Sequence, residues 1–386
     1  MELLAIALSA AVTAALPAAA QDPSPKTDNR TIVVTGRPLE ESRRALAECL
    51  ARKCPPNEDI DATLAHAENL FVAGDYKAAR RTTLASIARN RGHASAHPVP
   101  LADLYRANGR IAAHLGEGRS YESSTNAIAR SLKAGIGGDD VRIIAAELEK
   151  AEMYATLGRT ERSRRIYGKM RRKAERLDRD DIAAQIRLRA AWLHQLEDNE
   201  VFARAALKEI AADRTAAARP ARAAALVLLA RLDREKGQPA DSDALAADLR
   251  GMSGDRPVLI FAPPIDTPVN AADLGVSGWI LRRMPMQAFE KQWIDVGFRI
   301  GADGRVDDVE MLRSRGSTNW AKPVLDSIAG RIYSQAGGPE GHYRVERYSL
   351  TSLWDYKAPA THRRVRSPQA RIEMLDLTAE AKPRSD

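Results

Sequence analysis

Apolar residues recur at intervals of three and four from about Glu40 to Arg250, the spacing that places them on one face of an α-helix. Gly, Asp or Pro breaks the pattern at regular intervals, which predicts many short helices. The residues expected at the turns are 44, 40, 40 and 39 positions apart: Gly74, Gly118, Gly158, Asp198 and Gly237. Each interval is long enough for two helices and two turns. We therefore expect an array of helical hairpins.

The first of these units resembles a tetratricopeptide repeat. Residues 67–90 contain large apolar residues, the turn Gly74-Asp75-Tyr76, and a small Ala79 that lets the second helix pack closely. The later units match that family less well and are longer than its 34 residues. The resemblance implies a superhelix over residues 40–250, whose concave groove holds a peptide or a protein surface.

The pattern changes at Arg256. Residues 257–261 are apolar and β-type, and they predict a short strand or a linker. Residues 293–300 then alternate strictly, which predicts a half-buried strand. One face of that strand would be apolar and the other would contain the intervening residues: Ile294, Val296, Phe298 and Ile300 against Asp295, Gly297 and Arg299.

The next residues predict the rest of a small domain. Residues 301–304 supply a turn, and residues 305–313 a second strand with a bulge around Asp307 and Asp308. Residues 319–331 predict a helix, and residues 343–354 alternate again as a third strand.

This order resembles the C-terminal domain of the energy transducer TonB. The resemblance is carried by these residues: Phe298, Arg299, Ile300, Asp303, Gly304, Arg305, Val306, Val309, Ile332 and Tyr333. It implies a β-β-α-β domain at residues 257–356 that binds an extended segment through a sheet edge. In that family a Tyr-Pro pair precedes the first strand, whereas this chain has Pro285 without the tyrosine. It also has no proline-rich spacer. The expected fold class is α+β and mostly α, with a helical repeat array followed by this domain.

A short β-type run near the N-terminus resembles the TonB box of outer-membrane receptors: Thr31, Ile32, Val33, Val34 and Thr35. The resemblance implies pairing with this chain's own C-terminal domain, with that of a neighbour, or with TonB. The alternative is a short strand or a disordered run that has no partner.

The first twenty residues predict a signal peptide. An apolar stretch from Leu3 to Leu16 precedes Pro17 and small residues at Ala18 and Ala20, so cleavage would leave Gln21 as the N-terminus. The usual cationic start is absent, and an uncleaved anchor is the alternative. Residues 21–39 read as a linker, and the expected location is the periplasm.

Cys49 and Cys54 are the two cysteines of the chain. In an oxidising compartment a close isolated pair predicts a disulfide, whereas in the cytosol both would be free thiols. A zinc site would need two further ligands, and the neighbouring sequence contains none.

Charge points to anionic partners. The formal net charge is +8, and loss of Glu2 with the leader makes it +9. The densest basic run comprises Arg162, Arg164, Arg165, Lys169, Arg171, Arg172 and Lys173. It is either a patch for acidic partners or lipid head groups, or a solvated helix face balanced by Asp178, Asp180 and Asp181. We expect no nucleic-acid partner for an exported chain. Residues 357–386 read as a flexible basic tail, with residues 372–377 as an alternative edge strand.

No group of residues predicts catalysis, a metal site or a cofactor. His93 and His97 are four residues apart but lack the acidic partner of a metalloprotease motif. The carboxylates near residues 303–310 do not have the spacing of a calcium loop. The sequence therefore predicts a non-catalytic periplasmic adaptor that binds envelope proteins or peptides, with a link to TonB-dependent transport. Its alternatives are a basic module that binds anionic lipid or polymer, and an enzyme with its site in the helical groove.

Overall fold

A computed structural model describes residues 39–237, 257–265, 292–334, 341–357, 364–365, 367 and 369–378. The predicted signal peptide and the TonB-box-like run at residues 31–35 lie outside the described residues. Within the described ranges, no helix is both long enough and apolar enough to cross a membrane.

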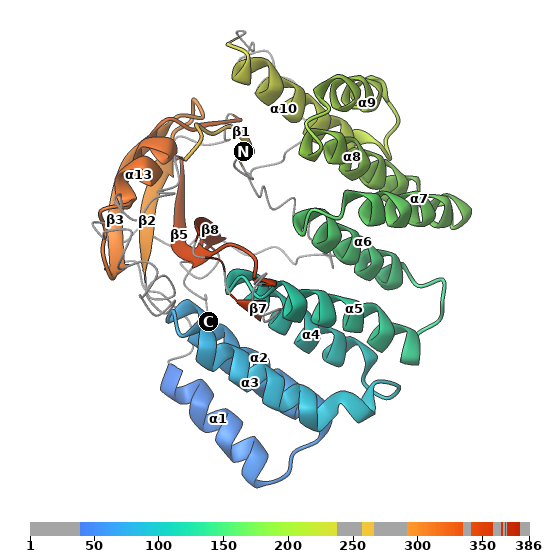
Figure 1. Ribbon diagram of the computed structural model, residues 1–386, viewed down its shortest axis with the longest axis vertical. Coiled ribbons are helices and arrows are strands. Elements are labelled where there is room, and N and C mark those ends of the chain that lie inside the picture. The colour runs from blue at the N-terminus through green and yellow to red at the C-terminus, as the bar shows by residue number, and fades with distance from the viewer. Residues whose placement is uncertain are drawn as a thin grey trace, which may run out of the picture.

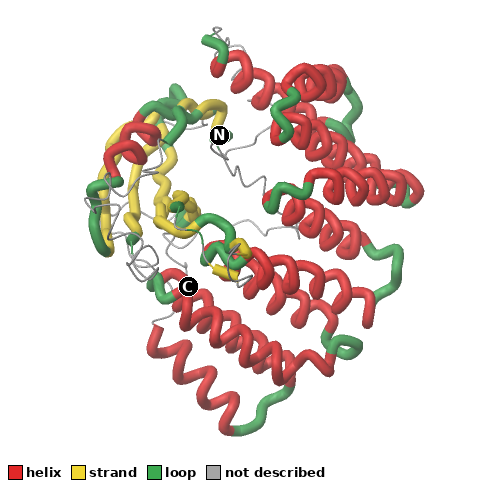
Figure 2. The backbone as a smooth tube through the Cα atoms, viewed as in Figure 1, coloured by secondary structure: helices red, strands yellow, loops and turns green. Residues whose placement is uncertain are grey.

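The first part of the molecule is an array of antiparallel helices (Figures 1 and 2). It comprises α1 (Leu39–Ala51), α2 (Pro56–Val72), α3 (Tyr76–Asn90), α4 (Pro98–His114), α5 (Gly118–Gly135), α6 (Val141–Thr156), α7 (Thr160–Arg176), α8 (Asp180–Leu196), α9 (Glu200–Ala212) and α10 (Arg219–Glu235), with a 3-10 turn η1 (Arg91–His93) after α3. Pairs α2/α3, α4/α5, α6/α7 and α8/α9 are hairpins, and α10 begins the next unit. The predicted helical repeat architecture is confirmed.

Each of the four described hairpin turns, and the end of α10, contains a residue in the left-handed region. These residues are Gly74, Gly116, Gly158, Asp198 and Gly237, with φ between 55° and 78°. The prediction placed the second turn at Gly118, but Gly118 is the first residue of α5 and the turn residue is Gly116. With this correction the intervals become 42, 42, 40 and 39 residues, which is a more regular repeat.

Small residues let neighbouring helices approach closely. Ala79 is completely buried between Leu70, Tyr76 and Ile111, as its position in the first unit predicted.

Asp75 caps α3, because its carboxylate accepts a hydrogen bond from the backbone N–H of Ala78 at 3.0 Å. Successive hairpins contain their own apolar clusters, so the core of the array is a series of clusters along its length.

The second part is a four-stranded antiparallel sheet of order β3-β2-β5-β8. Its elements are β2 (Trp293–Ile300), β3 (Val306–Arg315), helix α13 (Ala321–Ala329) and β5 (His342–Ser352), followed by β8 (Ala370–Asp376). The short strands β1 (Leu259–Phe261) and β4 (Ile332–Tyr333) pair with each other, as do β6 (Tyr356–Lys357) and β7 (Arg364–Val365). The predicted order of two strands, a helix and a third strand is present.

The two faces of β2 differ from the prediction. Ile294, Val296 and Phe298 are fully buried against α13, as expected. The opposite face was predicted to be solvated, yet Asp295 is also fully buried. The reason is that this face packs against the helical array. The alternation of residues within one strand cannot predict such a contact with another part of the chain.

Strand β3 contains the predicted irregularity. Gly297 pairs with Glu310 and Arg299 with Asp307, so β3 has one extra residue between these pairs. Asp308 has a φ of 51°, which allows the strand to bend there. A second register shift follows between Asp295 and Val296 of β2.

The C-terminal segment corrects the prediction of a flexible tail. Residues Ala370–Asp376 form β8, which pairs with β5 from Ser352 to Glu346. The alternative of an edge strand at residues 372–377 therefore describes this part of the chain. The small domain extends past residue 356, because β8 is part of its sheet.

The sheet connects the two ends of the helical array (Figure 1). At one end, the Trp293 ring lies against Gly74, and the carbonyl groups of Ser352 and Leu353 lie against Gly116. At the other end, Arg231 of α10 donates hydrogen bonds to the carbonyl oxygens of Leu259 and Ile260 at 2.7 and 2.9 Å. We call the contact between β2, β5 and the first two turns the docking seam.

Replacement of Gly116 by Ala tests the docking seam. The new Cβ would lie 2.6 Å from the carbonyl oxygen of Ser352, and the residue has a φ of +70°. We expect the free energy of unfolding to fall by about 3 kcal/mol, from left-handed strain and steric overlap together. Gly158→Ala is the control, because Gly158 has a φ of +72° and no atom within 4 Å of the added Cβ. It should cost only about 1 kcal/mol. Chemical denaturation measures both changes. An equal decrease in the free energy of unfolding for the two variants would contradict the close packing at Gly116.

Candidate interaction sites

A buried ion pair lies at the centre of the docking seam. Asp295 accepts hydrogen bonds from the Arg347 guanidinium at 2.6 and 2.9 Å and from Arg313 at 2.9 Å. Arg347 lies 3.8 Å from the centre of the Trp293 ring and also donates to the carbonyl oxygen of Val72 on the array. Burial opposes the charge on Arg347, but its bonds with Asp295 raise its pKa above the ordinary value. The pair links β2, β5 and α2.

His114 lies beside this ion pair. Its ring is 4.0 Å from the centre of the Tyr76 ring, and its carbonyl oxygen accepts a hydrogen bond from Thr351 of β5. Tyr76 in turn shares a 3.0 Å hydrogen bond with Ser349 of β5. Burial, together with the charges of Arg371 and Arg347, lowers the pKa of His114 to about 3. The imidazole is therefore neutral at physiological pH.

Beyond Gly116, an aromatic and cationic stack completes the seam. The rings of Tyr121 and Trp354 are parallel within 9°, with centres 5.7 Å apart. The guanidinium of Arg371 on β8 lies 4.4 Å from the Trp354 ring centre and donates to the carbonyl oxygen of Ala113. Asp355 accepts a hydrogen bond from the backbone N–H of Gly118 at 2.8 Å. These contacts hold β8 against the array.

A row of charged side chains crosses the first helices of three hairpins, and we call it the polar ladder: Asp103, Arg106, Glu149, Glu152 and Arg189. Arg106 of α4 donates two bonds from Nε to the Glu149 carboxylate of α6, at 2.9 and 3.0 Å. Arg189 of α8 donates to Glu152 at 2.7 Å. The side chain of Glu152 is 44% exposed, so the row remains accessible to a partner.

The polar ladder lies near the sheet. Burial raises the pKa of Tyr121, and the charges of Glu152, Glu149 and the β8 residue Glu373 raise it further. Burial likewise raises the pKa values of Glu152 and Glu373, although Arg189 and Arg371 oppose the shifts. Carboxylates of the ladder and of β8 therefore surround one tyrosine between the array and the sheet.

Neither edge of the sheet is an open acceptor for a strand. The edge of β5 that faces away from β2 is filled by β8 along seven residue pairs. Within the described residues, strand β3 pairs only with β2, so its other edge is uncovered. Its pairing with β2 contains two register shifts, and it has exposed charged residues, among them Asp307, Asp308 and Glu310. Bulges and charges of this kind oppose pairing with another chain. The TonB resemblance implied an open sheet edge. In the structure β8 occupies the β5 edge, and the bulges and charges of β3 oppose strand pairing at the other edge.

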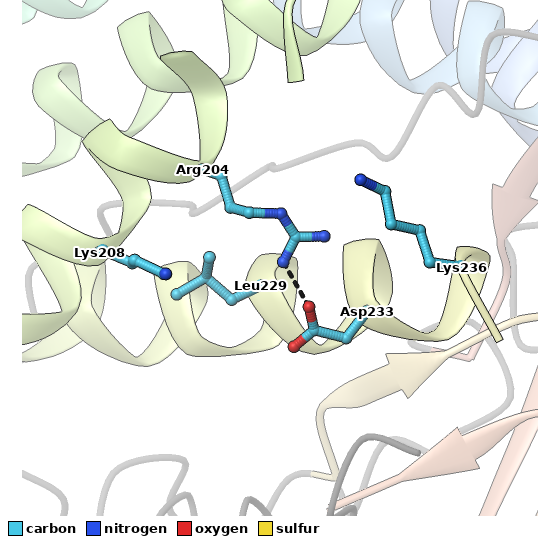
Figure 3. A pocket seen from close by; sticks show the side chains of 5 residues that line it. All are labelled: Arg204, Lys208, Leu229, Asp233 and Lys236. Carbon is cyan, nitrogen blue, oxygen red and sulfur yellow. Dashed lines mark hydrogen bonds and ion pairs between the residues drawn. The ribbon is translucent and has the colours of Figure 1, made fainter. Parts of the chain in front are cut away.

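Two surface hollows lie elsewhere on the array. A hollow of about 400 Å³ between α9 and α10 is lined by Arg204, Lys208, Leu229, Asp233 and Lys236 (Figure 3). Arg204 pairs with Asp233, and Glu200 pairs with Arg204 at 2.9 Å and with Lys236 at 2.8 Å, so most of its charges are compensated. A second hollow, of about 490 Å³, lies between α5 and α6, where Glu147 pairs with Lys133 and Lys150.

The predicted basic run lies on α7, and the structure divides it. Arg164, Arg171 and Lys173 each pair with a carboxylate of a nearby residue. The remaining members, Arg162, Arg165, Lys169 and Arg172, are exposed. The aspartates expected to balance the run do not pair with it in the described contacts; Asp181 pairs instead with Arg179 at 2.7 Å.

Cys49 and Cys54 form a disulfide between the end of α1 and the start of α2. Cys49 is buried, and the bridge fixes the first helix to the array, as the sequence predicted. His93 and His97 lie in and after the turn η1. Among the described residues, no group of three or more His, Cys, Asp or Glu side chains could hold a metal ion.

The sequence-based reasoning did not identify the docking seam or the polar ladder. One signal for the seam was available, because a carboxylate at Asp295 inside the apolar run of β2 requires a buried cationic partner. The ladder gives no such signal, since its ion pairs join helices about 40 residues apart in the chain.

No protein-family model and no curated protein matches the chain. Among solved structures, it is similar to a kinesin light chain protein of Podosopora anserina with nearly identical TPR-like repeats, at 14% identity and a TM-score of 0.39, over 51% of this chain and 96% of that one. BtubC (BKLC) from P. vanneervenii is 14% identical with a TM-score of 0.40, over 57% and 89% of the two chains. The apo form of RapI is 14% identical with a TM-score of 0.35, over 56% and 74%.

The pH dependence of stability tests the burial of His114. Because its folded pKa is about 3 and its unfolded pKa about 6.5, the unfolded state binds more protons between these values. Stability from this group is complete above pH 6.5 and falls by about 1.4 kcal/mol per pH unit below it. His114→Phe, which cannot be protonated, should reduce the slope of unfolding free energy against pH between pH 6 and 4. Substitution of the exposed His93 by Phe is the control and should leave that slope unchanged. The same slope in the wild type and in both variants would contradict the lowered pKa of His114.

Proposed function

We propose that the protein is a non-catalytic interaction adaptor of the bacterial periplasm, which binds a charged, extended segment of an envelope protein along the polar ladder. The observation that carries this proposal is the ladder itself. Its side chains have both signs of charge and lie on three successive hairpins of a rigid array. A partner with complementary charges would gain charge-assisted hydrogen bonds there at little ordering cost.

The neighbourhood of the ladder supports an extended partner. The ladder crosses α4, α6 and α8, so it follows the long direction of the repeat array. Burial raises the pKa values of Asp103 and Glu152, and a cationic side chain of a partner would stabilise their charged forms. β8 and Trp354 lie near its α6 carboxylates, because Tyr121 stacks on Trp354 and senses the charges of Glu149, Glu152 and the β8 residue Glu373; there they would restrict the approach of a bulky folded domain.

The sheet has two roles in this proposal. It braces the array through the docking seam, and its β5 edge accepts an extended strand, a place that β8 fills in this structure. The order of β2, β3, α13 and β5 supports the resemblance to the TonB C-terminal domain. A TonB-dependent receptor, or TonB itself, is accordingly the envelope protein that we propose as a partner.

Site-specific photo-cross-linking in the native envelope tests the use of the ladder. A photoreactive residue in place of Glu149 should capture a partner, and Arg106→Gln with Arg189→Gln should reduce that capture by tenfold or more, since two charge-assisted contacts are lost. The same residue in place of Lys322, whose side chain on α13 is 81% exposed, is the control. Capture of the same species from both positions would contradict binding at the ladder.

The proposed location has its own test. N-terminal sequencing of the protein isolated from the envelope fraction should give Gln21 as the first residue, because a signal peptidase would cleave after Ala20. Recovery of the intact N-terminus in the cytosolic fraction would exclude the periplasmic location and, with it, a periplasmic partner for the ladder.

A further inference from the structure

One face of α7 is dominated by cations, with Glu161 at its N-terminal edge. Positions separated by three or four residues lie on the same side of a helix. On α7 five such positions are all basic and all exposed, and we call them the cationic stripe: Arg162, Arg165, Lys169, Arg172 and Arg176. From first to last the stripe rises about 21 Å along the helix axis.

The cations of the stripe differ from their neighbours on the same helix. Arg164 pairs with Glu161 and Glu197, and Arg171 pairs with Glu175. No stripe residue has an ion pair with a carboxylate within the described part of the chain. Arg165 and Arg176 donate only to backbone carbonyl oxygens, and Arg162 lies 5.5 Å from the Tyr154 ring centre. The stripe therefore carries charge that the molecule itself does not neutralise.

The charge of the stripe belongs to a wider asymmetry of the array. Helix α7 contains eight Lys or Arg residues and two carboxylates, and α3 contains four Lys or Arg residues and no carboxylate. The first helix of the first hairpin, α2, has the opposite composition, with four carboxylates and no Lys or Arg. Helix α7 extends to the side of the array opposite the sheet (Figure 1). The helix with the largest excess of positive charge thus extends away from the docked domain.

We propose that the cationic stripe docks the protein on a membrane surface that contains anionic phospholipids. A straight row of long, exposed cations matches a plane of phosphate groups, which requires no hollow and no fixed register. A folded domain, unlike the extended segment proposed for the polar ladder, concentrates its binding energy in a desolvated apolar or aromatic anchor at the centre of its contact. The large apolar residues of α7 do not supply one, because Tyr167 and Met170 are buried in the core of the array.

This docking defines an orientation for the molecule. With α7 against the lipid head groups, the sheet on the opposite side points away from the membrane. The inference does not depend on the polar ladder, because the stripe and the ladder are made of different residues. Membrane docking and partner binding therefore fail or succeed separately.

Binding of the full-length protein to lipid vesicles tests the proposal. Vesicles of phosphatidylcholine with about one-third phosphatidylglycerol should bind the protein, and pure phosphatidylcholine vesicles should not. Each Lys or Arg near an anionic surface strengthens binding by about fivefold, so R165Q/K169Q/R172Q should bind about 100-fold more weakly. Added salt should weaken the wild type in the same direction.

A matched variant separates the stripe from net charge. R164Q/R171Q/K173Q removes the same three charges from the same helix, but from residues that are already paired, and it should bind within about threefold of the wild type. R165K/R172K keeps the charge and should bind like the wild type. Circular dichroism melting of each variant verifies that α7 is folded, since the stripe residues are exposed and contribute little to stability.

The outcomes are distinct. Equal losses in the two triple variants would reduce the effect to overall charge and overturn the proposal. Failure of the wild type to bind phosphatidylglycerol vesicles would overturn it as well. Tighter binding to polyglutamate than to vesicles at equal charge concentration, lost in R165Q/K169Q/R172Q, would assign the stripe to an acidic protein instead.

Discussion

The buried ion pair between Asp295 and Arg347 is the interaction on which the arrangement of the two parts depends. Removal of Asp295 would leave the buried Arg347 uncompensated, a cost of about 3–5 kcal/mol. The pair is also directional, because Arg347 bonds to the array through the carbonyl oxygen of Val72 while it bonds to β2 through Asp295. Apolar contacts alone would allow the sheet to slide over the helices, whereas these bonds specify one position.

That position changes what the repeat array can do. An open solenoid flexes along its length, because each repeat contacts only its neighbours. Here the sheet contacts the turns at Gly74 and Gly116, and β1 contacts α10 through Arg231. A chain of hairpins joined at both ends to one small domain loses much of that freedom, because β1 and β4 pack on the same core as the four-stranded sheet. The charges of the polar ladder, which lie between these ends, are consequently held at fixed separations.

Local patterns predicted the elements well, and long-range contacts explain where they did not. The alternation in residues 293–300 gave the bounds of β2, and apolar spacing gave the hairpins. Gly116 and Gly118 flank the same turn, and only the backbone conformation distinguishes the turn residue from the first residue of α5. The burial of Asp295 and the pairing of β8 arise from contacts across 18 residues of sequence or more, which periodicity does not encode.

Strand β8 covers the sheet edge through which the TonB resemblance implied binding. A β-β-α-β domain with a free β5 edge would offer a row of unpaired backbone groups, and such an edge is prone to association. Here the chain covers that edge with its own C-terminal segment, and Arg371 secures the segment through Trp354 and the carbonyl oxygen of Ala113. An incoming strand would have to break these side-chain contacts as well as seven residue pairs. The helical array therefore has the more accessible binding surface, and pairing at the sheet requires a partner that binds more strongly than β8.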